Sequence, residues 1–287
     1  MTLTYRHVDV FATRPFTGNS LAVFPGGPAL SAEQMLVITQ EFRHFETIFL
    51  GEPTEDNVVD ARIFDLFEEL DFAGHPLLGA AAVLHESRAS DGVLHWRFRL
   101  KDRTVTITTR PTTGGYQVEL DQGAPQFLGV VDGEDRDAVA AGLNLEMLAD
   151  DLPLEVVSTG LRYLIVPVRG GLDRARIVRD DFAELIGRHG AQFAYLLDVD
   201  ALEGRHWNND GVMEDVATGS AAGCVGGYLA RHSVVPTGEE FTLRQGRFTG
   251  RPSRITVCAE GTADALANVR IGGDVVMVAT GTLEVLP

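Results

Sequence analysis

One glutamate, Glu46, has the most chemically suggestive surroundings in the chain. Its neighbours Phe45, Ile48 and Phe49 are apolar, so its carboxyl group can be partly removed from water. Burial disfavours the carboxylate anion, raises the pKa of the acid and makes it a useful proton donor or acceptor near neutral pH. Local sequence also allows an outward-facing glutamate on an alternating strand, and by itself favours that interpretation. Glu46 is therefore a candidate acid/base that needs support from other residues.

Two further ionisable residues lie beside glycine turns. His75 directly follows Gly74 at an expected helix start, where it can take part in chemistry or simply cap and pack. Asp215 lies three residues before Thr218, where it can be a charge partner or an N-terminal cap. Neither residue identifies a reaction by itself.

The two glycine turns belong to stretches that repeat along the chain. Thr218 aligns with Ala73, which gives an offset of 218 − 73 = 145 residues. In each stretch a glycine turn precedes small and apolar residues, which predicts helices over 73–84 and 218–229 that are buried all round. A helix N-terminus gathers N–H groups and positive dipole, and so favours an anion. Two ordinary core helices remain the alternative.

The other elements must position these turns, and their pattern is typical of an α+β fold. Ser31 and Gln34 form a capping box that predicts a helix to Phe42. Further helices are expected over 134–148 and 181–187. A polar segment, 205–210, predicts a loop. Strands are expected over 5–10, 21–24, 46–50, 61–67, 93–100, 104–109, 115–120, 154–160, 163–168, 193–198, 242–245, 254–259 and 265–271, with two more in 274–286.

A break in this pattern predicts two domains. The run Gln122-Gly123-Ala124-Pro125 interrupts the strands near the middle of the chain. It divides the chain into halves of residues 1–124 and 125–287, and the last strand can return to the first half. A chain of 287 residues is long enough for two domains.

Composition limits the partners and the compartment. A net charge of −17 argues against nucleic acid and anionic membrane surfaces, although a cleft can still attract a small anion. No apolar run reaches membrane-spanning length, and the first residues show no signal-peptide pattern. Two cysteines, Cys224 and Cys258, make a disulfide framework unexpected. The default expectation is a cytoplasmic protein.

The sequence gives no support for a cofactor or a metal. The single lysine, Lys101, falls at an expected hairpin tip, whereas a Schiff-base lysine needs a desolvated pocket. The histidines and cysteines never fall at metal-ligand spacing, and no nucleophile elbow or nucleotide-binding loop is present. We therefore expect no cofactor and no metal.

Taken together, the motifs resemble those of the phenazine-biosynthesis PhzF family, within the diaminopimelate epimerase-like superfamily. The resemblance covers nearly the whole chain, and its most specific part is the pair Ala73-Gly74-His75-Pro76 and Glu214-Asp215-Val216-Ala217-Thr218-Gly219-Ser220-Ala221. Further matching segments are 9–12, 16–24, 46–49, 62–64, Glu69, 157–161, 245–246 and 250–253.

The resemblance implies a fold and a site. The fold is two pseudo-symmetric domains, each a curved, mostly antiparallel sheet around a central helix, with the site between the two glycine turns and a homodimer as the assembly. Glu46 would be the shuttling acid/base, with His75 and Asp215 as catalytic partners. The residues implied to bind the substrate carboxylate and its surroundings are Asn19, Gly74, Gly219 and Ser220.

Departures from the family pattern bear on the substrate. The superfamily's epimerases start each turn with a cysteine, but here those positions are Ala73 and Thr218, which cannot supply a thiolate. Phe45 stands where the family usually has a small hydroxyl residue, Ser20 replaces a proline, and Val216 replaces another. We therefore expect an isomerase that moves a proton on a small, cyclic or unsaturated carboxylic acid. A racemase or dehydratase of amino or hydroxy acids, and a metabolite-binding protein without turnover, are the alternatives.

Overall fold

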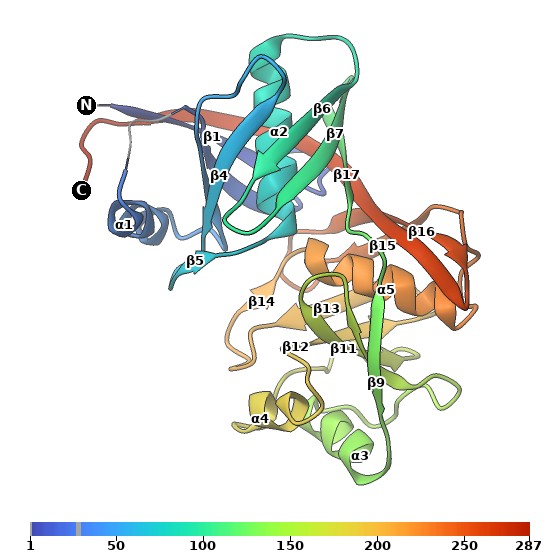
Figure 1. The fold of residues 1–287 in the computed structure, drawn as a ribbon. Coiled ribbons are helices and arrows are strands. Elements are labelled where there is room, and N and C mark those ends of the chain that lie inside the picture. The colour runs from blue at the N-terminus through green and yellow to red at the C-terminus, as the bar shows by residue number, and fades with distance from the viewer. Residues whose placement is uncertain (1, 27–29) are drawn as a thin grey trace. The chain divides into compact units, whose positions relative to one another are not determined.

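The computed structural model describes residues 2–26 and 30–287, which form two compact units (Figure 1). Unit 1 consists of Met1–Leu120 together with Gly272–Pro287, and unit 2 consists of Asp121–Ile271. The last strand, β17 (Ala265–Leu283), therefore contributes residues to both units. The predicted boundary after Ala124 stays a prediction.

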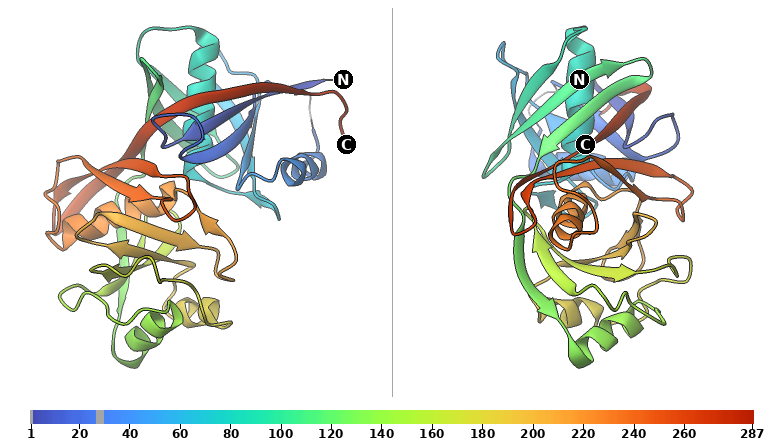
Figure 2. Two further views of the ribbon diagram at one scale, coloured as in Figure 1. Left: turned by 180° about the vertical axis from the view of Figure 1, so that it is seen from behind. Right: turned by 90° about the vertical axis from the view of Figure 1, so that its right-hand side faces the viewer.

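Unit 1 is a curved sheet around one central helix, α2, which Figures 1 and 2 show among its strands. The helix packs against β1, β2, β3, β6 and β7, and β1 also pairs with the end of β17. The elements are β1 (Leu3–Val10), β2 (Asn19–Phe24), α1 (Ala32–Phe42), β3 (Thr47–Leu50), β4 (Val58–Phe64), β5 (Glu69–Leu70), α2 (Gly74–Arg88), β6 (Leu94–Arg99), β7 (Thr104–Thr112) and β8 (Gly115–Asp121).

Unit 2 has the same plan around the helix α5, which packs against β10, β11 and β16. Its elements are β9 (Gln126–Val131), α3 (Gly133–Gly142), β10 (Leu154–Ser158), β11 (Arg162–Val168), α4 (Phe182–Gly187), β12 (Phe193–Asp198), β13 (Glu203–Trp207), β14 (Glu214–Asp215), α5 (Gly219–Arg231), β15 (Phe241–Gln245) and β16 (Ser253–Thr262).

The strand pairings of the two units also correspond. In unit 1, β2 pairs with β3 and β4 with β6 in parallel, and in unit 2, β11 pairs with β12 and β13 with β15 in parallel. The equivalent neighbours β3–β4 and β12–β13, β4–β5 and β13–β14, and β6–β7 and β15–β16 are antiparallel. The predicted α+β fold of two pseudo-symmetric halves, each mostly antiparallel around one helix, is confirmed.

Both central helices are buried on every side because small residues let strands approach them. All residues from 74 to 85 of α2 are buried. A Cβ atom added to Gly79 would stand 2.5 Å from Leu21 Cδ2, and one added to Gly226 of α5 would stand 2.5 Å from Val257 Cγ1. Any larger side chain would therefore push the sheet away from its helix. The predicted helices and their all-round burial are confirmed.

The predicted loop over 205–210 is wrong for its first half, because 203–207 form the buried strand β13, whereas 208–210 form a turn after that strand. Arg205, although charged, is satisfied inside the protein: its guanidinium donates to both carboxylate oxygens of Glu214 at 2.8 and 2.7 Å and to the backbone oxygens of Leu172 and Ala175. It also lies over the rings of Trp207 at 4.4 Å and Phe248 at 4.3 Å. A polar segment can be a buried strand when every charge has such partners.

Other predicted elements differ from the structure in extent or number. The expected helix over 134–148 ends at Gly142, because Asn144 takes a left-handed φ of 57° and its side chain donates to the backbone oxygen of Arg174. The expected strand over 61–67 ends at Phe64, where the Asp65 carboxylate accepts two backbone N–H groups and forms a turn. The strands expected over 265–271 and 274–286 are one continuous strand, β17.

An arginine–glutamate pair ties down the two-residue strand before each central helix. In unit 1, Arg62 donates to both oxygens of Glu69 at 2.7 and 2.6 Å, and both side chains are more than one-third exposed. In unit 2, Arg205 makes the same paired contact with Glu214, but their side chains are 9% and 14% exposed. The two pairs have one geometry in two different environments.

We predict that this difference in burial decides how much each pair stabilises the fold. Arg205→Ala leaves a largely buried carboxylate without its partner and should reduce the free energy of unfolding by roughly 3–5 kcal/mol. The matched control Arg62→Ala breaks an exposed pair and should cost about 1 kcal/mol or less. Urea unfolding of both variants measures these losses. Equal losses in the free energy of unfolding for the two variants would show that burial does not decide the contribution of each pair.

Candidate functional site

In unit 1 the structure brings together the two ionisable residues that the sequence singles out. Glu46 directly precedes β3 and is 8% exposed, so the outward-facing alternative is wrong. His75 is the second residue of α2 and is 4% exposed. Glu46 Oε2 lies 3.0 Å from His75 Nδ1. A buried carboxyl group in contact with an imidazole can hold or exchange a proton with it, which is the arrangement that acid/base chemistry needs.

Asn19 and Gly74 lie near the ends of elements that also position this pair. Asn19 begins β2 and is buried, and β2 runs parallel to β3 with Ala22 opposite Thr47. Asn19 and Glu46 therefore stand at the same end of two neighbouring strands. Gly74 is the first residue of α2, and among the described residues no side chain caps that helix at Ala73. Its N-terminal turn is thus a candidate for holding an anion.

In unit 2, Asp215 holds the turn that leads into α5. Its carboxylate accepts a hydrogen bond from the Thr218 hydroxyl at 2.7 Å and one from the Ala217 N–H at 3.3 Å. The Gln245 side chain donates to the Asp215 backbone oxygen and to the Thr218 hydroxyl, both at 2.9 Å, and accepts from the Thr218 N–H at 3.1 Å. Asp215 is 5% exposed. These contacts give it a clear role in shaping the turn.

Gly219 and Ser220 form the first turn of α5, and neighbouring side chains hold both of them. Gln122 donates to the Gly219 backbone oxygen at 3.0 Å and accepts from the Thr159 hydroxyl at 2.8 Å. The Ser220 hydroxyl lies 2.8 Å from the hydroxyl of Tyr163. Among the described residues no side chain caps this helix at its first position either. The turn therefore presents N–H groups and a hydroxyl from a fixed backbone.

Sequence reasoning missed the residues that support this turn. Gln122 lies in the run that predicts the domain boundary, and Thr159 and Gln245 lie in segments that match the family pattern. The sequence assigns a functional role to none of the three. Tyr163 began an expected strand and carried no local signal at all. Each of them acts through a hydrogen bond to a residue far away in the sequence.

Burial controls the charge of several groups around α5. It lowers the pKa of His206, although the nearby Asp215 charge acts in the opposite direction, so the imidazole is neutral at neutral pH. His206 Nδ1 lies 2.9 Å from the backbone oxygen of Ala194 and donates to it. Burial raises the pKa of the Cys224 thiol to about 11. Cys224 is fully buried within α5, so it packs in the core rather than serving as a thiolate.

Three further features of the described residues concern metal binding, membrane spans and cysteines. Within residues 2–26 and 30–287 no group of three or more His, Cys, Asp or Glu side chains is arranged to hold a metal ion. No helix in the described part of the chain is long and apolar enough to cross a membrane. Both cysteines are free and buried. The predicted cytoplasmic location stays a prediction.

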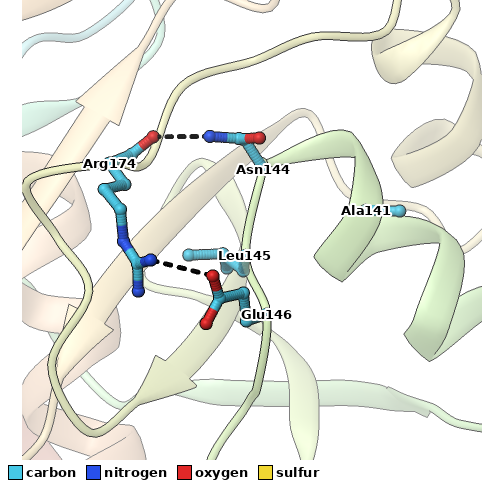
Figure 3. A pocket seen from close by; sticks show the side chains of 5 residues that line it. All are labelled: Ala141, Asn144, Leu145, Glu146 and Arg174. Carbon is cyan, nitrogen blue, oxygen red and sulfur yellow. Dashed lines mark hydrogen bonds and ion pairs between the residues drawn. The ribbon is translucent and has the colours of Figure 1, made fainter.

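A surface pocket of about 220 Å³ lies in unit 2 (Figure 3). It is lined by Ala141, Asn144, Leu145, Glu146 and Arg174. Within it Arg174 Nη1 is 2.8 Å from Glu146 Oε1, and the Asn144 amide donates to the Arg174 backbone oxygen at 2.9 Å. No residue that the sequence singles out for chemistry lines this pocket. Its side chains satisfy one another, which is typical of an ordinary surface depression.

Comparison with known proteins gives matches over nearly the full length. A family model described as phenazine biosynthesis-like protein matches residues 8–281. The chain is 32% identical to the trans-2,3-dihydro-3-hydroxyanthranilate isomerase of Pseudomonas aeruginosa, covering 96% of this chain and 98% of that protein. It is 45% identical to the solved structure of a predicted epimerase from Pseudomonas aeruginosa, with a TM-score of 0.92 and 99% of each chain covered. A PhzF-family phenazine biosynthesis protein from Bacillus anthracis is 25% identical, with a TM-score of 0.84 over 99% of this chain and 100% of that one.

We predict that the buried neutral His206 makes unit 2 sensitive to acid. Its pKa is lowered in the folded state, so the unfolded chain takes up a proton first as the pH falls below about 6.5. The stability is fully present above that pH and is lost as the pH falls through the lowered value, at up to about 1.4 kcal/mol per pH unit. Urea unfolding between about pH 5.5 and 7.5 should show a smaller pH dependence for His206→Gln than for the wild type. Identical pH dependence would contradict this role.

Proposed function

The chain belongs to the PhzF family of phenazine-biosynthesis-like isomerases, as its motifs predicted, and we propose that it shifts a proton on a small, cyclic or unsaturated carboxylic acid without a cofactor. One observation carries the proposal: the buried carboxyl group of Glu46 lies 3.0 Å from His75 Nδ1. Isomerisation of this kind needs one group that removes a proton from carbon and returns it to another carbon. Glu46 is the residue that we assign to this task.

The proposed reaction balances without any oxidant or reductant. The Glu46 carboxylate takes a proton from a carbon next to a double bond, and the electron pair of the broken C–H bond forms a new double bond. The electron pair of the old double bond moves to a second carbon, which takes the proton back from the Glu46 acid. His75 contacts the Glu46 carboxyl group at 3.0 Å. Its ring nitrogen can donate a hydrogen bond to the carboxylate or accept one from the acid, so it can stabilise both forms of Glu46. Asp215 acts as the polar partner in unit 2 by fixing the turn that it shares with Thr218.

We assign binding of the substrate carboxylate to helix N-termini. The first residues of α2 and α5, Gly74 and Gly219, contribute backbone amides, and Ser220 adds its N–H and its hydroxyl. Asn19 contributes a polar side chain at the end of β2. Glu46 and His75 belong to unit 1, and Gly219 and Ser220 belong to unit 2.

The first substrate to test is suggested by relatives. A relative that is 32% identical is named for the isomerisation of trans-2,3-dihydro-3-hydroxyanthranilate, a cyclic unsaturated amino acid with a ring carboxylate. This compound fits the class that we propose, and we offer it as a candidate for this chain. Phe45, directly before the proposed acid/base, is the residue that we expect to alter the preference among such acids.

Two alternatives remain open to experiment. A racemase or dehydratase of amino or hydroxy acids would introduce solvent deuterium at a Cα position. The 45% identity to a protein described as a predicted epimerase supports the racemase alternative. Against it, Ala73 and Thr218 cannot form a two-thiol site. A metabolite-binding protein without turnover would bind the acid but exchange no proton. We further propose that the protein is cytoplasmic and forms a homodimer. Light scattering of the purified protein tests the dimer.

Glu46→Gln is predicted to abolish most of the turnover. The amide keeps the shape of the side chain but cannot take up the proton, so kcat should fall by roughly 10²- to 10⁴-fold while KM changes little. Turnover of the candidate substrate is followed by NMR in deuterated water, with Glu68→Gln at an exposed position of the same unit as the control. Full turnover by Glu46→Gln would show that the acid/base assignment is wrong and would make Asp215 or His75 the leading candidate.

Ser220→Ala is predicted to act mainly on binding. It removes one donor to the substrate carboxylate, which is worth roughly 1.5–3 kcal/mol for a hydrogen bond to a charged group. KM should therefore rise while kcat changes little. Ser87→Ala, at the exposed C-terminal end of α2, serves as the control. If Ser220→Ala lowered kcat and left KM unchanged, the serine would belong to the proton-transfer step instead.

A further inference from the structure

We propose that Tyr163 is a positioning residue that aims the Ser220 hydroxyl at the carboxylate of the substrate. This inference rests on the proposed function, because it concerns the group that binds the carboxylate there. The two hydroxyl oxygens lie 2.8 Å apart, which is the usual distance for a strong O–H···O hydrogen bond. Tyr163 is 2% exposed and lies in β11, whereas Ser220 is half-buried and lies in the first turn of α5. The tyrosine is therefore more deeply buried than the serine to which it is bonded.

The chemistry of the ligand decides which hydroxyl donates. A serine hydroxyl has one proton, and a carboxylate can only accept hydrogen bonds. If Ser220 gave its proton to Tyr163, its oxygen would face the carboxylate with lone pairs and would repel it. If Tyr163 donates to Ser220, the serine proton remains for the carboxylate. The second arrangement is favoured when a carboxylate is bound, because it leaves the Ser220 hydroxyl proton free to donate to that anion.

The ring of Tyr163 is held in place by other aromatic groups. Its centroid lies 5.6 Å from that of Phe193, its partner in the pairing of β11 with β12, and 5.5 Å from that of His206 in an edge-on contact. His206 is itself fixed by donating to the backbone oxygen of Ala194. Packing of this kind leaves the tyrosine hydroxyl at one position. A donor with a fixed position can select one rotamer of the serine.

The backbone of Ser220 is fixed independently of its side chain. Gln122 donates a hydrogen bond to the backbone oxygen of the preceding residue, Gly219. The Thr159 hydroxyl lies 3.4 Å from the backbone oxygen of Ser220 itself and donates to it. Gly223 makes room for these groups, since a Cβ atom there would stand 1.8 Å from Gln122 Oε1. The remaining freedom of Ser220 is rotation about its χ1 bond. The contact with Tyr163 restricts that rotation and orients the donor before the ligand arrives.

A double-mutant cycle tests this inference by isothermal titration calorimetry. The probes are 3-hydroxyanthranilate, the stable aromatic counterpart of the candidate substrate, and 2-aminophenol, which is the same ring without the carboxylate. Tyr163→Phe keeps the ring and removes the hydroxyl, so affinity for the acid should fall roughly 2- to 10-fold while affinity for the aminophenol is unchanged. Ser220→Ala should cause a larger loss, and the double variant should bind no worse than Ser220→Ala alone.

A matched control separates positioning from general loosening of unit 2. Tyr228→Phe removes another buried tyrosine hydroxyl from the packing of α5, one that donates to the Pro153 backbone oxygen at 2.7 Å near the other end of the helix. It should leave affinity for the acid unchanged. Losses by Tyr163→Phe and Ser220→Ala that simply add, or equal losses for both probes, would overturn the positioning role and leave the proposed function intact. If the wild type bound the acid no better than 2-aminophenol, the carboxylate-binding site itself would be wrong, and both proposals would fall.

Discussion

The close approach of each sheet to its central helix is the constraint on which the rest of the structure depends. Gly79 and Gly226 permit it, since any Cβ atom at either position would stand 2.5 Å from a side chain of the sheet. Because each helix is then held on every side, its first residue is fixed relative to the strands of its own unit. The arginine–glutamate pairs add a second restraint on the short strand just before each helix. A precisely placed helix N-terminus is the outcome in both units, and it is what an anion-binding turn requires.

The two units share this scaffold but differ in chemistry. Glu46 is the residue immediately before β3, and the equivalent residue before β12 is Gln192. The Gln192 side chain accepts the Arg162 N–H at 3.0 Å, and a neutral amide cannot take up a proton at this position. Unit 1 thus holds the ionisable pair of Glu46 and His75, whereas unit 2 holds the Asp215 carboxylate together with hydroxyl and amide groups around the start of α5. Repetition supplies the geometry, and single substitutions within the repeat supply the difference in side-chain chemistry.

Patterns that depend on near neighbours could be predicted from the sequence. The Ser31–Gln34 capping box is present with both of its hydrogen bonds, and the small-residue helices are buried as their composition required. Arg205 could not be placed in this way, because its burial depends on Glu214 and on aromatic rings that only the folded chain brings to it. The same holds for Tyr163, whose contact with Ser220 joins residues on different elements. For Glu46, local sequence pointed outward, whereas the resemblance of the whole chain to a family assigned it an acid/base role, and the structure shows that the residue is buried.

The pairing of the first strand with the last has a consequence for how the protein is made. Leu3 of β1 lies opposite Leu283 of β17, so the sheet of unit 1 needs both ends of the chain. Unit 2 is one continuous segment, Asp121–Ile271, and all of its strands have left the ribosome before the final residues of β17 do. Contacts between residues so distant in sequence form late and slowly. During translation, the unit that carries Glu46 and His75 must therefore wait with an incomplete sheet while the second unit can already fold. Loss of residues 275–283 would remove the partner of β1 from the half of the molecule that is synthesised first.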